Sequence, residues 1–484
     1  MTDILITHSY FLRFDPKQWK AQQPYPPLAT LFAAAVLLNE KFNLTFYDMM
    51  FAQNASEIEA IIATNKPKYF VIYDDGFNYL TKMCLTNMRD AAFEMAAIAK
   101  KFGCKVIVSS SDSTDHSADY LNANFDFVIV GEGEQTLSEL VKALNNNVND
   151  FSAINGLRYK NNSTITETNK RENLKDLDLL PMPAWQLLNI APYKNAWMKS
   201  KGFFSINIAT TRGCPYKCNW CAKPIYGNRY NSRSPQNVVN ELLYLKTHFK
   251  FDHIWFCDDI FGLKTNWVSE FANLVESNNL KLKYKIQSRV DLLLEESLAT
   301  NKKETQIEAL ARSGCDEVWV GAESGSQKIL DAMDKGTKIE QIAKATQLMK
   351  QHKIKPCFFL QFGYINERYD DIKLTLKMLL ELMPHDIGIS VSYPLPGTKF
   401  YNTVKEQMIG KTNWTDSDEL AIMFNATYPA VFYKKLQRYV HYKFRQKQAF
   451  LALINNGKII KGLSLTYRIP QTLLASWSIQ KHVK

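Results

Sequence analysis

The sequence predicts an α/β protein with an N-terminal doubly wound parallel sheet, a central partial (β/α)6 barrel and a helical C-terminal region. Three observations lead to this prediction. Apolar runs of strand length alternate with helical patterns over the first 146 residues. The alternation resumes near residue 203 with six further βα units, and only helical patterns follow residue 401. Strands that alternate with helices indicate parallel sheets with helices on both faces.

The first predicted domain, residues 1–146, has five strand-like runs: DILITHS, LTFYDMM, YFVIYDD, KVIVSSS and FDFVIVG. Helical patterns from Pro27 to Lys41 and from Leu80 to Phe102 separate some of them. Such a pattern predicts a flavodoxin-like sheet, whose ligand crevice lies at the carboxyl ends of its strands. The residues expected at that edge are His8, Ser9, Asp48, Asp74 to Gly76, Ser109, Ser110, Ser111, Gly131, Glu132, Gly133 and Glu134.

Residues 147–202 break the alternation. The run GLRYKNNSTITETNK predicts a hairpin, and the prolines of LLPMPAW mark irregular chain. We interpret this segment as a connector between domains.

The second α/β series, residues 203–400, has strand candidates FSINIAT, HIWFCDD, KYKIQSR, EVWVGAE, PCFFLQFGY and IGISVSYP. Six βα units of this length suggest a partial barrel, whose functional groups gather at the carboxyl ends of the strands. The residues expected at this mouth are Asp258, Asp259, Gln287, Arg289, Glu323, Gln361 and Tyr393.

The run RGCPYKCNWC follows the first of these strands and places Cys214, Cys218 and Cys221 in one loop. Zinc sites usually have four protein ligands, and no second cysteine pair follows here. The nearby histidine, His248, lies 27 residues beyond Cys221. Three thiolates on a cubane iron–sulfur cluster would leave one iron open to an external ligand. A three-cysteine zinc or structural site is the alternative.

The remaining cysteines occur in apolar contexts without regular spacing, so we interpret them as small buried residues and expect no auxiliary cluster. They are Cys84, Cys104, Cys257, Cys315 and Cys357.

The CxxxCxxC pattern, with Trp220 before its last cysteine, resembles the radical S-adenosylmethionine (SAM) superfamily. The resemblance implies that Cys214, Cys218 and Cys221 bind a [4Fe-4S] cluster whose fourth iron is chelated by SAM, which one electron cleaves to a 5'-deoxyadenosyl radical. It also implies an external electron donor of the flavodoxin or ferredoxin type. Further cofactor contacts implied by this resemblance are Trp220, Asp258 or Asp259 for the amino end of SAM, Gln287 and Arg289 for its carboxylate or ribose, and Glu323 in GAESGS for its ribose.

The runs YPPLATLFAAAVL and FVIVGEGEQTLSELVKAL resemble the cobalamin-binding domain found in one branch of that superfamily, over roughly residues 1–400 in all. The implied corrin contacts are Ser109, Ser110, Ser111, Gly131, Glu132 and Gly133. Two features depart from related patterns: no DxHxxG motif follows the first strand, and serines replace the glycines and histidine that many relatives have after the fourth. A sheet that only buttresses the barrel is therefore an alternative. We do not expect His8 or His116 to ligate cobalt.

The resemblance implies methylation of an unactivated carbon or phosphorus of a small metabolite. Cyclisation or rearrangement without methyl transfer is one alternative, and a cobalamin or iron–sulfur protein without catalysis is another. The sequence does not identify the substrate.

The net charge of +11 comes from residues 430–484, which contain eight Lys, three Arg and no Asp or Glu. Leu436, Tyr439, Val440, Lys443 and Phe444 have helical spacing, which predicts an amphipathic helix with a cationic face. Such a helix can contact an anionic membrane, although its face can equally be solvated or cover the barrel. We do not expect nucleic-acid binding, because no compact C-terminal β module is evident. With no leader or long apolar segment, a cytoplasmic location is expected.

Overall fold

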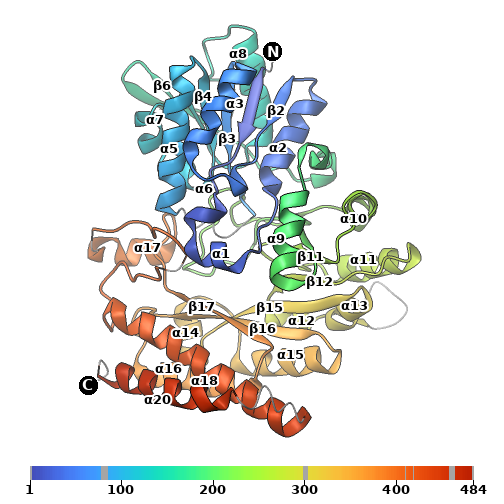
Figure 1. The fold of residues 1–484 in the computed structure, drawn as a ribbon, viewed down its shortest axis with the longest axis vertical. Coiled ribbons are helices and arrows are strands. Elements are labelled where there is room, and N and C mark those ends of the chain that lie inside the picture. The colour runs from blue at the N-terminus through green and yellow to red at the C-terminus, as the bar shows by residue number, and fades with distance from the viewer. Residues whose placement is uncertain are drawn as a thin grey trace. The chain divides into compact units, whose positions relative to one another are not determined.

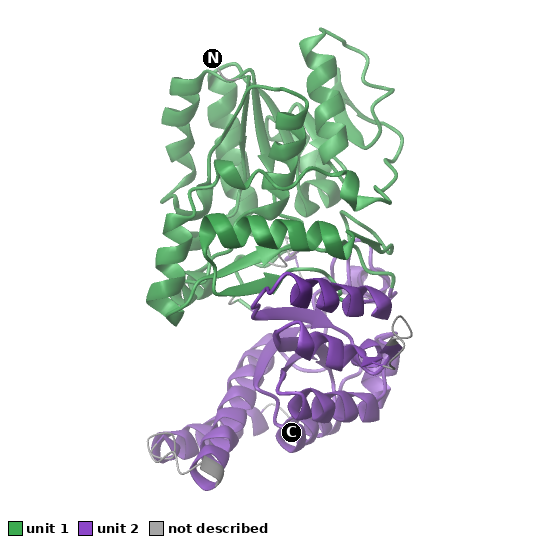
Figure 2. Ribbon diagram, turned by 90° about the vertical axis from the view of Figure 1, so that its right-hand side faces the viewer, with its two compact units in different colours: residues 1–215, 223–261, 413–419 green, residues 216–222, 262–412, 420–484 purple. Residues whose placement is uncertain are grey.

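A computed structural model describes residues 3–77, 85–297, 304–408, 410–417, 419–456 and 464–481 (Figure 1). The chain divides into two units (Figure 2). Unit 1 comprises residues 1–215, 223–261 and 413–419, and unit 2 comprises residues 216–222, 262–412 and 420–484. The four predicted domains stay a prediction.

Unit 1 contains the first parallel sheet, in the strand order β2-β1-β3-β4-β5. All five predicted strands are confirmed: β1 (Ile4–Thr7), β2 (Leu44–Phe46), β3 (Tyr69–Tyr73), β4 (Lys105–Ser109) and β5 (Phe127–Ile129). The predicted hairpin also forms, as β6 (Leu157–Asn161) and β7 (Thr164–Glu167), and extends this sheet in antiparallel fashion beyond β5. The first part of the predicted connector is therefore built into the sheet.

Helices accompany this sheet: α2 (Leu28–Asn39), α3 (Ile58–Asn65), α5 (Thr86–Lys101), α6 (Ser111–Asp115), α7 (Ser117–Asn122) and α8 (Glu134–Asn145). One core joins Phe70 and Val106 of the strands to Ile62 of α3 and Met95 of α5, all fully buried. Alternate strand residues thus point toward α3 and α5. The start of the predicted helix from Leu80 lies outside the described residues.

The other elements of unit 1 are η1 (Leu12–Phe14), α1 (Pro16–Ala21), η2 (Met49–Phe51), η3 (Ala55–Glu57), η4 (Leu177–Leu179), η5 (Trp185–Leu187), α9 (Ala191–Lys201), β8 (Ser205–Ile208), β9 (Thr211–Arg212), β10 (Asn231–Ser232), α10 (Pro235–Phe249) and β11 (His253–Phe256). Strands β8 and β11 pair in parallel. They are the first two strands predicted for the second series.

The other four predicted strands lie in unit 2 as β12 (Tyr284–Ser288), β15 (Cys315–Glu323), β16 (Lys355–Phe362) and β17 (Asp386–Val391). They pair in parallel in that order. The elements between and after them are α11 (Thr265–Ser277), α12 (Val290–Leu293), β13 (Glu296–Ser297), β14 (Glu304–Thr305), α13 (Gln306–Arg312), α14 (Gln327–Ala332), α15 (Ile339–Gln351), α16 (Tyr369–Leu382), α17 (Lys399–Val404), η6 (Lys405–Gln407), α18 (Ala430–Asn456) and α20 (Leu465–Gln480).

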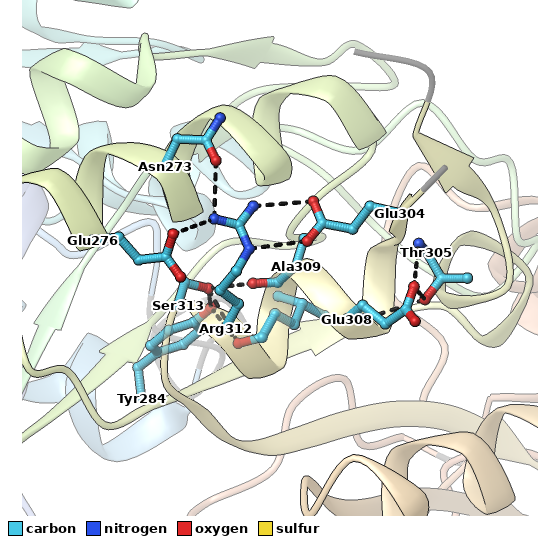
Figure 3. A network of polar contacts seen from close by, with 10 residues as sticks. Asn273, Glu276, Tyr284, Glu304, Thr305, Glu308, Ala309, Arg312 and Ser313 are labelled. Atoms are coloured by element: carbon cyan, nitrogen blue, oxygen red, sulfur yellow. Dashed lines mark hydrogen bonds and ion pairs between the residues drawn. The ribbon is translucent and has the colours of Figure 1, made fainter. Parts of the chain in front are cut away.

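A polar network fixes the start of β12, the strand that leads to Gln287 and Arg289 (Figure 3). Arg312, at the end of α13, donates to Glu304 at 3.0 Å and to Glu276 of α11 at 2.7 Å. The buried hydroxyl of Tyr284 lies 2.7 Å from that of Ser313. These contacts hold α11, α13 and β12 together at the end of the strand opposite to the predicted site.

The apolar face predicted for the C-terminal helix is confirmed in α18, where Leu436, Val440 and Phe444 are fully buried. Helix α18 packs against α16 and β17, so this face covers the barrel strands of unit 2. None of the helices within the described ranges is both long and apolar enough to cross a lipid bilayer.

Candidate functional site

The predicted cluster loop begins where β9 pairs with β10, with Arg212 opposite Asn231. Gly213 has a φ of +79°, and a Cβ at this position would overlap the carbonyl of Arg229, so only glycine fits. The three cysteines follow, all partly exposed, with Cys214 in unit 1 and Cys218 and Cys221 in unit 2.

Arg212 ties the start of this loop to the GEGE segment of the first sheet. Its guanidinium forms ion pairs with Glu132 and, at 2.6 Å, with Glu134. The Arg212 and Glu132 side chains are only 4% and 8% exposed. The rings of Phe32, Phe77 and Tyr226 lie within 6 Å of the guanidinium carbon. Because these charges are buried among aromatic rings, removal of one of them would leave its partner desolvated and without a counterion.

The pKa values of this network follow from burial and charge. Burial raises the pKa of Glu132, and the charge of Arg212 opposes the rise. Burial alone would lower the pKa of Arg212, but Glu134, Tyr226 and Glu132 raise it well above its usual value. Arg212 is therefore a permanent buried cation two residues before the first cysteine.

In unit 2, the predicted residue Arg289 contacts the predicted ligand Cys218. One guanidinium nitrogen donates to the Cys218 sulfur at 3.8 Å, and another donates to the Lys335 carbonyl at 2.9 Å. Asp291 accepts from the same guanidinium at 3.0 Å, and the ring of Tyr216 lies 3.7 Å below it. Burial alone would lower the pKa of Arg289, but Asp291 and the Cys218 sulfur raise it.

The predicted residue Glu323 forms a buried ion pair with Lys335, at 2.8 Å, and the two side chains are 5% and 8% exposed. Gly321 makes room for the pair, because a Cβ there would overlap both charged ends. Lys335 also lies 5.9 Å from the Trp220 ring, and its pKa, which burial would lower, is raised by Glu323 and Cys218. Two cations, Arg289 and Lys335, thus approach the Cys218 sulfur.

Asn219 anchors the loop between the cysteines. Its side chain donates to the Ala332 carbonyl at 2.6 Å and accepts from the Tyr364 hydroxyl at 2.9 Å, while its backbone N–H donates to Met333 at 3.0 Å. The next residue, Trp220, has a buried indole N–H with no acceptor. The loop is therefore fixed on α14 and carries an unsatisfied donor directly before Cys221.

Of the two predicted strand-end carboxylates, Asp258 is already engaged within unit 1. It accepts from the Thr210 N–H at 2.6 Å, the Thr210 hydroxyl at 2.5 Å and the Thr211 N–H at 2.9 Å. Burial raises its pKa to about 7. Asp258 therefore positions the chain just before the cysteine loop. Asp259 is exposed and Gln287 is partly exposed.

At the edge of the first sheet, the structure gives the predicted corrin residues partly structural roles. Ser110 caps α6 together with Ser113, whereas the buried hydroxyl of Ser111 has no partner. A Cβ at Gly133 would lie 2.8 Å from the Ser109 hydroxyl, so this glycine is required for packing. Gly131 has a φ of +78°, which favours glycine.

His8 is used within the protein. Its Nδ1 accepts from the Tyr10 N–H at 3.3 Å, so its Nε2 carries the proton that it donates to Asp48 at 2.8 Å. Both ring nitrogens of His8 are thus engaged within unit 1.

Four other cysteines, Cys104, Cys257, Cys315 and Cys357, are buried as predicted, and Cys84 lies outside the described residues. Across the described part of the chain, no three His, Cys, Asp or Glu side chains gather as a site for a single metal ion. A cubane cluster differs from such a site because its cysteines bind different iron atoms.

Sequence reasoning missed Arg212, Asn219 and Lys335. Arg212 and Asn219 are in the quoted cysteine run, and their burial as polar residues was not evident from it. Lys335 follows the fourth strand by a turn and a short helix, and no spacing rule connects it to Glu323.

Residues 208–379 match the Radical SAM superfamily. The chain is 27% identical over 291 residues to an uncharacterized methyltransferase of Pyrococcus horikoshii, a match that covers 60% of each protein. It is 23% identical over 401 residues to an anaerobic magnesium-protoporphyrin IX monomethyl ester cyclase of Synechocystis, covering 81% of this chain and 76% of the relative. The chain thus spans less than two thirds of the first relative.

Solved structures share the fold. The cobalamin-dependent SAM radical enzyme OxsB, with aqua-cobalamin and SAM bound, matches 97% of this chain and 72% of its own with a TM-score of 0.73 and 16% identity. The radical SAM methyltransferase TsrM of Kitasatospora setae, with cobalamin and a [4Fe-4S] cluster bound, matches 84% and 75% with a TM-score of 0.67 and 17% identity. The predicted fold class is confirmed.

Proposed function

We propose that this chain, which carries a radical SAM superfamily domain in the fold of cobalamin-dependent relatives, is a radical SAM enzyme that methylates an unactivated carbon or phosphorus of a small molecule. The observation that carries the proposal is the three-cysteine loop with Arg289 at the Cys218 sulfur and Lys335 beside it. Cys214, Cys218 and Cys221 would hold a [4Fe-4S] cluster.

The donor set fits such a cluster. Cys218 already accepts from a guanidinium N–H, and the partnerless indole N–H of Trp220 is a further donor next to Cys221. Hydrogen bonds to sulfur and nearby positive charge stabilise the more negative, reduced state of a cluster. Arg289 and Lys335 therefore suit a site that must accept an electron.

When bound, the cluster supplies an electron for reductive cleavage of SAM, and cobalamin supplies a carrier for the methyl group. The protein residues provide position and charge. Asp259 and Gln287 would contact the polar groups of SAM, and Glu323 is held in place by Lys335. At the edge of the first sheet, the partnerless hydroxyl of Ser111 is a group suited to a polar ligand such as the corrin periphery.

The test is anaerobic reconstitution of the full chain with iron, sulfide and hydroxocobalamin. We expect about four iron and four sulfide per chain, corrin absorption, and 5'-deoxyadenosine when SAM and a reductant are added. Cys214→Ala, Cys218→Ala and Cys221→Ala should each lose the cluster. Cys104→Ala, at a buried cysteine of the first sheet, is the matched control and should retain it.

The outcomes separate the candidate activities. A reconstituted cluster without 5'-deoxyadenosine formation would refute the enzyme and leave a binding protein. Methyl transfer from SAM carrying a labelled methyl group into a product supports the methyltransferase. Radical formation without any methyl transfer would favour the cyclase class, which the relative from Synechocystis represents. An external one-electron donor of the flavodoxin or ferredoxin type should replace the chemical reductant.

A further inference from the structure

Helix α20 presents its apolar side to solvent. It packs against α18 through a face that includes Thr472 and Ile479, which are 4% and 1% exposed. Leu473, Leu474 and Trp477 are 64%, 69% and 73% exposed. Figure 1 shows α18 and α20 side by side at the C-terminal end of the chain. An ordinary surface helix has the reverse pattern, with its apolar side toward the protein.

These exposed residues form one stripe. Positions 473, 474 and 477 are one, three and four residues apart and therefore lie on a single side of the helix. Three more large apolar residues, Phe450, Leu453 and Ile454, are exposed near the end of α18. Single exposed apolar residues need no explanation, but a contiguous group of this kind indicates an interaction site.

The positive charge of residues 430–484 indicates an anionic partner for the exposed stripe. Residues 430–484 contain eleven Lys and Arg and no acidic residue. In α18 the cations are Lys434, Lys435, Arg438, Lys443, Arg445 and Lys447. An anionic lipid bilayer offers phosphates to these cations and, directly below them, hydrocarbon for the Leu473, Leu474 and Trp477 side chains, whereas a nucleic acid backbone offers only the charge.

A cationic cavity lies beside the same two helices. Its volume is about 820 Å³, and it is lined by Arg445 of α18, Arg468 of α20 and Lys350, Lys353 and Lys355 from the start of β16 and the chain before it. Arg445 is paired with Asp386 at 2.5 Å and Lys355 with Asp316 at 2.8 Å, so part of this charge is compensated. Arg468 lies five, six and nine residues before Leu473, Leu474 and Trp477, and therefore on the opposite side of α20. The cavity is thus separate from the exposed stripe and does not take part in the proposal.

We propose that α18 and α20 dock unit 2 on the surface of an anionic lipid bilayer. The stripe of Leu473, Leu474 and Trp477 enters the interface between headgroups and acyl chains, where tryptophan is favoured. Lys and Arg side chains of the same two helices that reach the membrane surface meet the lipid phosphates. The surface lies on the bilayer and does not span it.

The test is co-sedimentation of the full-length protein with vesicles of phosphatidylcholine alone or with 30% phosphatidylserine. We expect at least tenfold tighter binding to the anionic vesicles, and a loss of that binding in 0.5 M NaCl. The variant Leu473→Ser/Leu474→Ser/Trp477→Ser should bind at least tenfold more weakly. Leu179→Ser changes a residue of unit 1 that is 72% exposed, and it should bind like the wild type.

A second variant tests the charge without touching the stripe. Lys443→Gln/Lys447→Gln, on the side of α18 that carries the exposed Phe450, Leu453 and Ile454, should reduce the preference for anionic over neutral vesicles severalfold. Circular dichroism should show that both multiple variants fold. Equal binding to the two vesicle types, or triple-variant binding equal to wild type, would overturn the proposal. So would light scattering that shows a wild-type dimer and a monomeric triple variant, because the stripe would then join two copies of this chain.

Discussion

The substitution Lys335→Met removes the cation from the buried pair with Glu323. At a separation of 2.8 Å, the gross attraction is about 6 kcal/mol for an effective dielectric constant of 20. Desolvation of the two ions offsets most of it, so the net contribution of the intact pair is small. The loss of Lys335 alone has a larger effect, because the buried Glu323 carboxylate would still be desolvated and would no longer have a counterion. We expect Lys335→Met to lower the free energy of unfolding by about 3–5 kcal/mol.

The measurement is urea-induced unfolding of the cluster-free protein, followed by tryptophan fluorescence. The double variant Glu323→Gln/Lys335→Met removes both charges of the pair and should recover most of the loss, to within about 2 kcal/mol of wild type. Lys328→Met is a matched control because its ion pair with Asp371 has a 59% exposed lysine, and it should cost about 1 kcal/mol or less. Equal losses in Lys335→Met and Lys328→Met, or no recovery in the double variant, would refute the reasoning.

Three further predictions follow from buried polar groups. Arg212→Met leaves Glu132 and Glu134 without their cation and should lower the free energy of unfolding by about 3–5 kcal/mol in urea titrations; a loss below about 1 kcal/mol would show that the network is dispensable. Asn219→Ala removes the anchors of the cysteine loop and should reduce iron bound per chain after reconstitution, whereas the exposed control Asn278→Ala should not. Burial raises the pKa of Glu367 from 4.5 to about 8. Between these two pH values the folded state keeps a proton that the unfolded state releases, so the free energy of unfolding falls as pH rises. Glu367→Gln should remove up to about 1.4 kcal/mol of this decline per pH unit between pH 5.5 and 7.5, and parallel pH profiles for the two proteins would contradict it.

The strands could be predicted from the sequence because each is a continuous apolar run in a buried parallel sheet, such as Tyr69–Tyr73 or Lys355–Phe362. The cysteine loop could also be located from the sequence, because the spacing of Cys214, Cys218 and Cys221 is a local pattern, and its role as a cluster site stays a prediction. The ion-pair partners of the residues around the cysteine loop could not be predicted from the sequence. Pairing of Glu323 with Lys335, or of Arg212 with Glu132, depends on where separate segments meet in space, and no local pattern encodes that meeting.

Prediction of the C-terminal region was incomplete for a related reason. The spacing of Leu436, Val440 and Phe444 correctly indicated an apolar face, which the protein covers itself. The sequence alone did not show that α20 would turn its leucines outward, because the choice between its two sides is made by packing against α18.

The ion pairs of Arg212 limit where this chain can be truncated. The guanidinium that precedes the cysteine loop takes both its counterions from the N-terminal sheet. A fragment that starts at residue 203 would keep Arg212 but lose both carboxylates. It would also lose the Phe32 and Phe77 rings that pack against the guanidinium. Residues 203–484 are therefore not a module that can be separated freely from the first sheet, because a shortened protein would have to replace the arginine or supply new carboxylates for it.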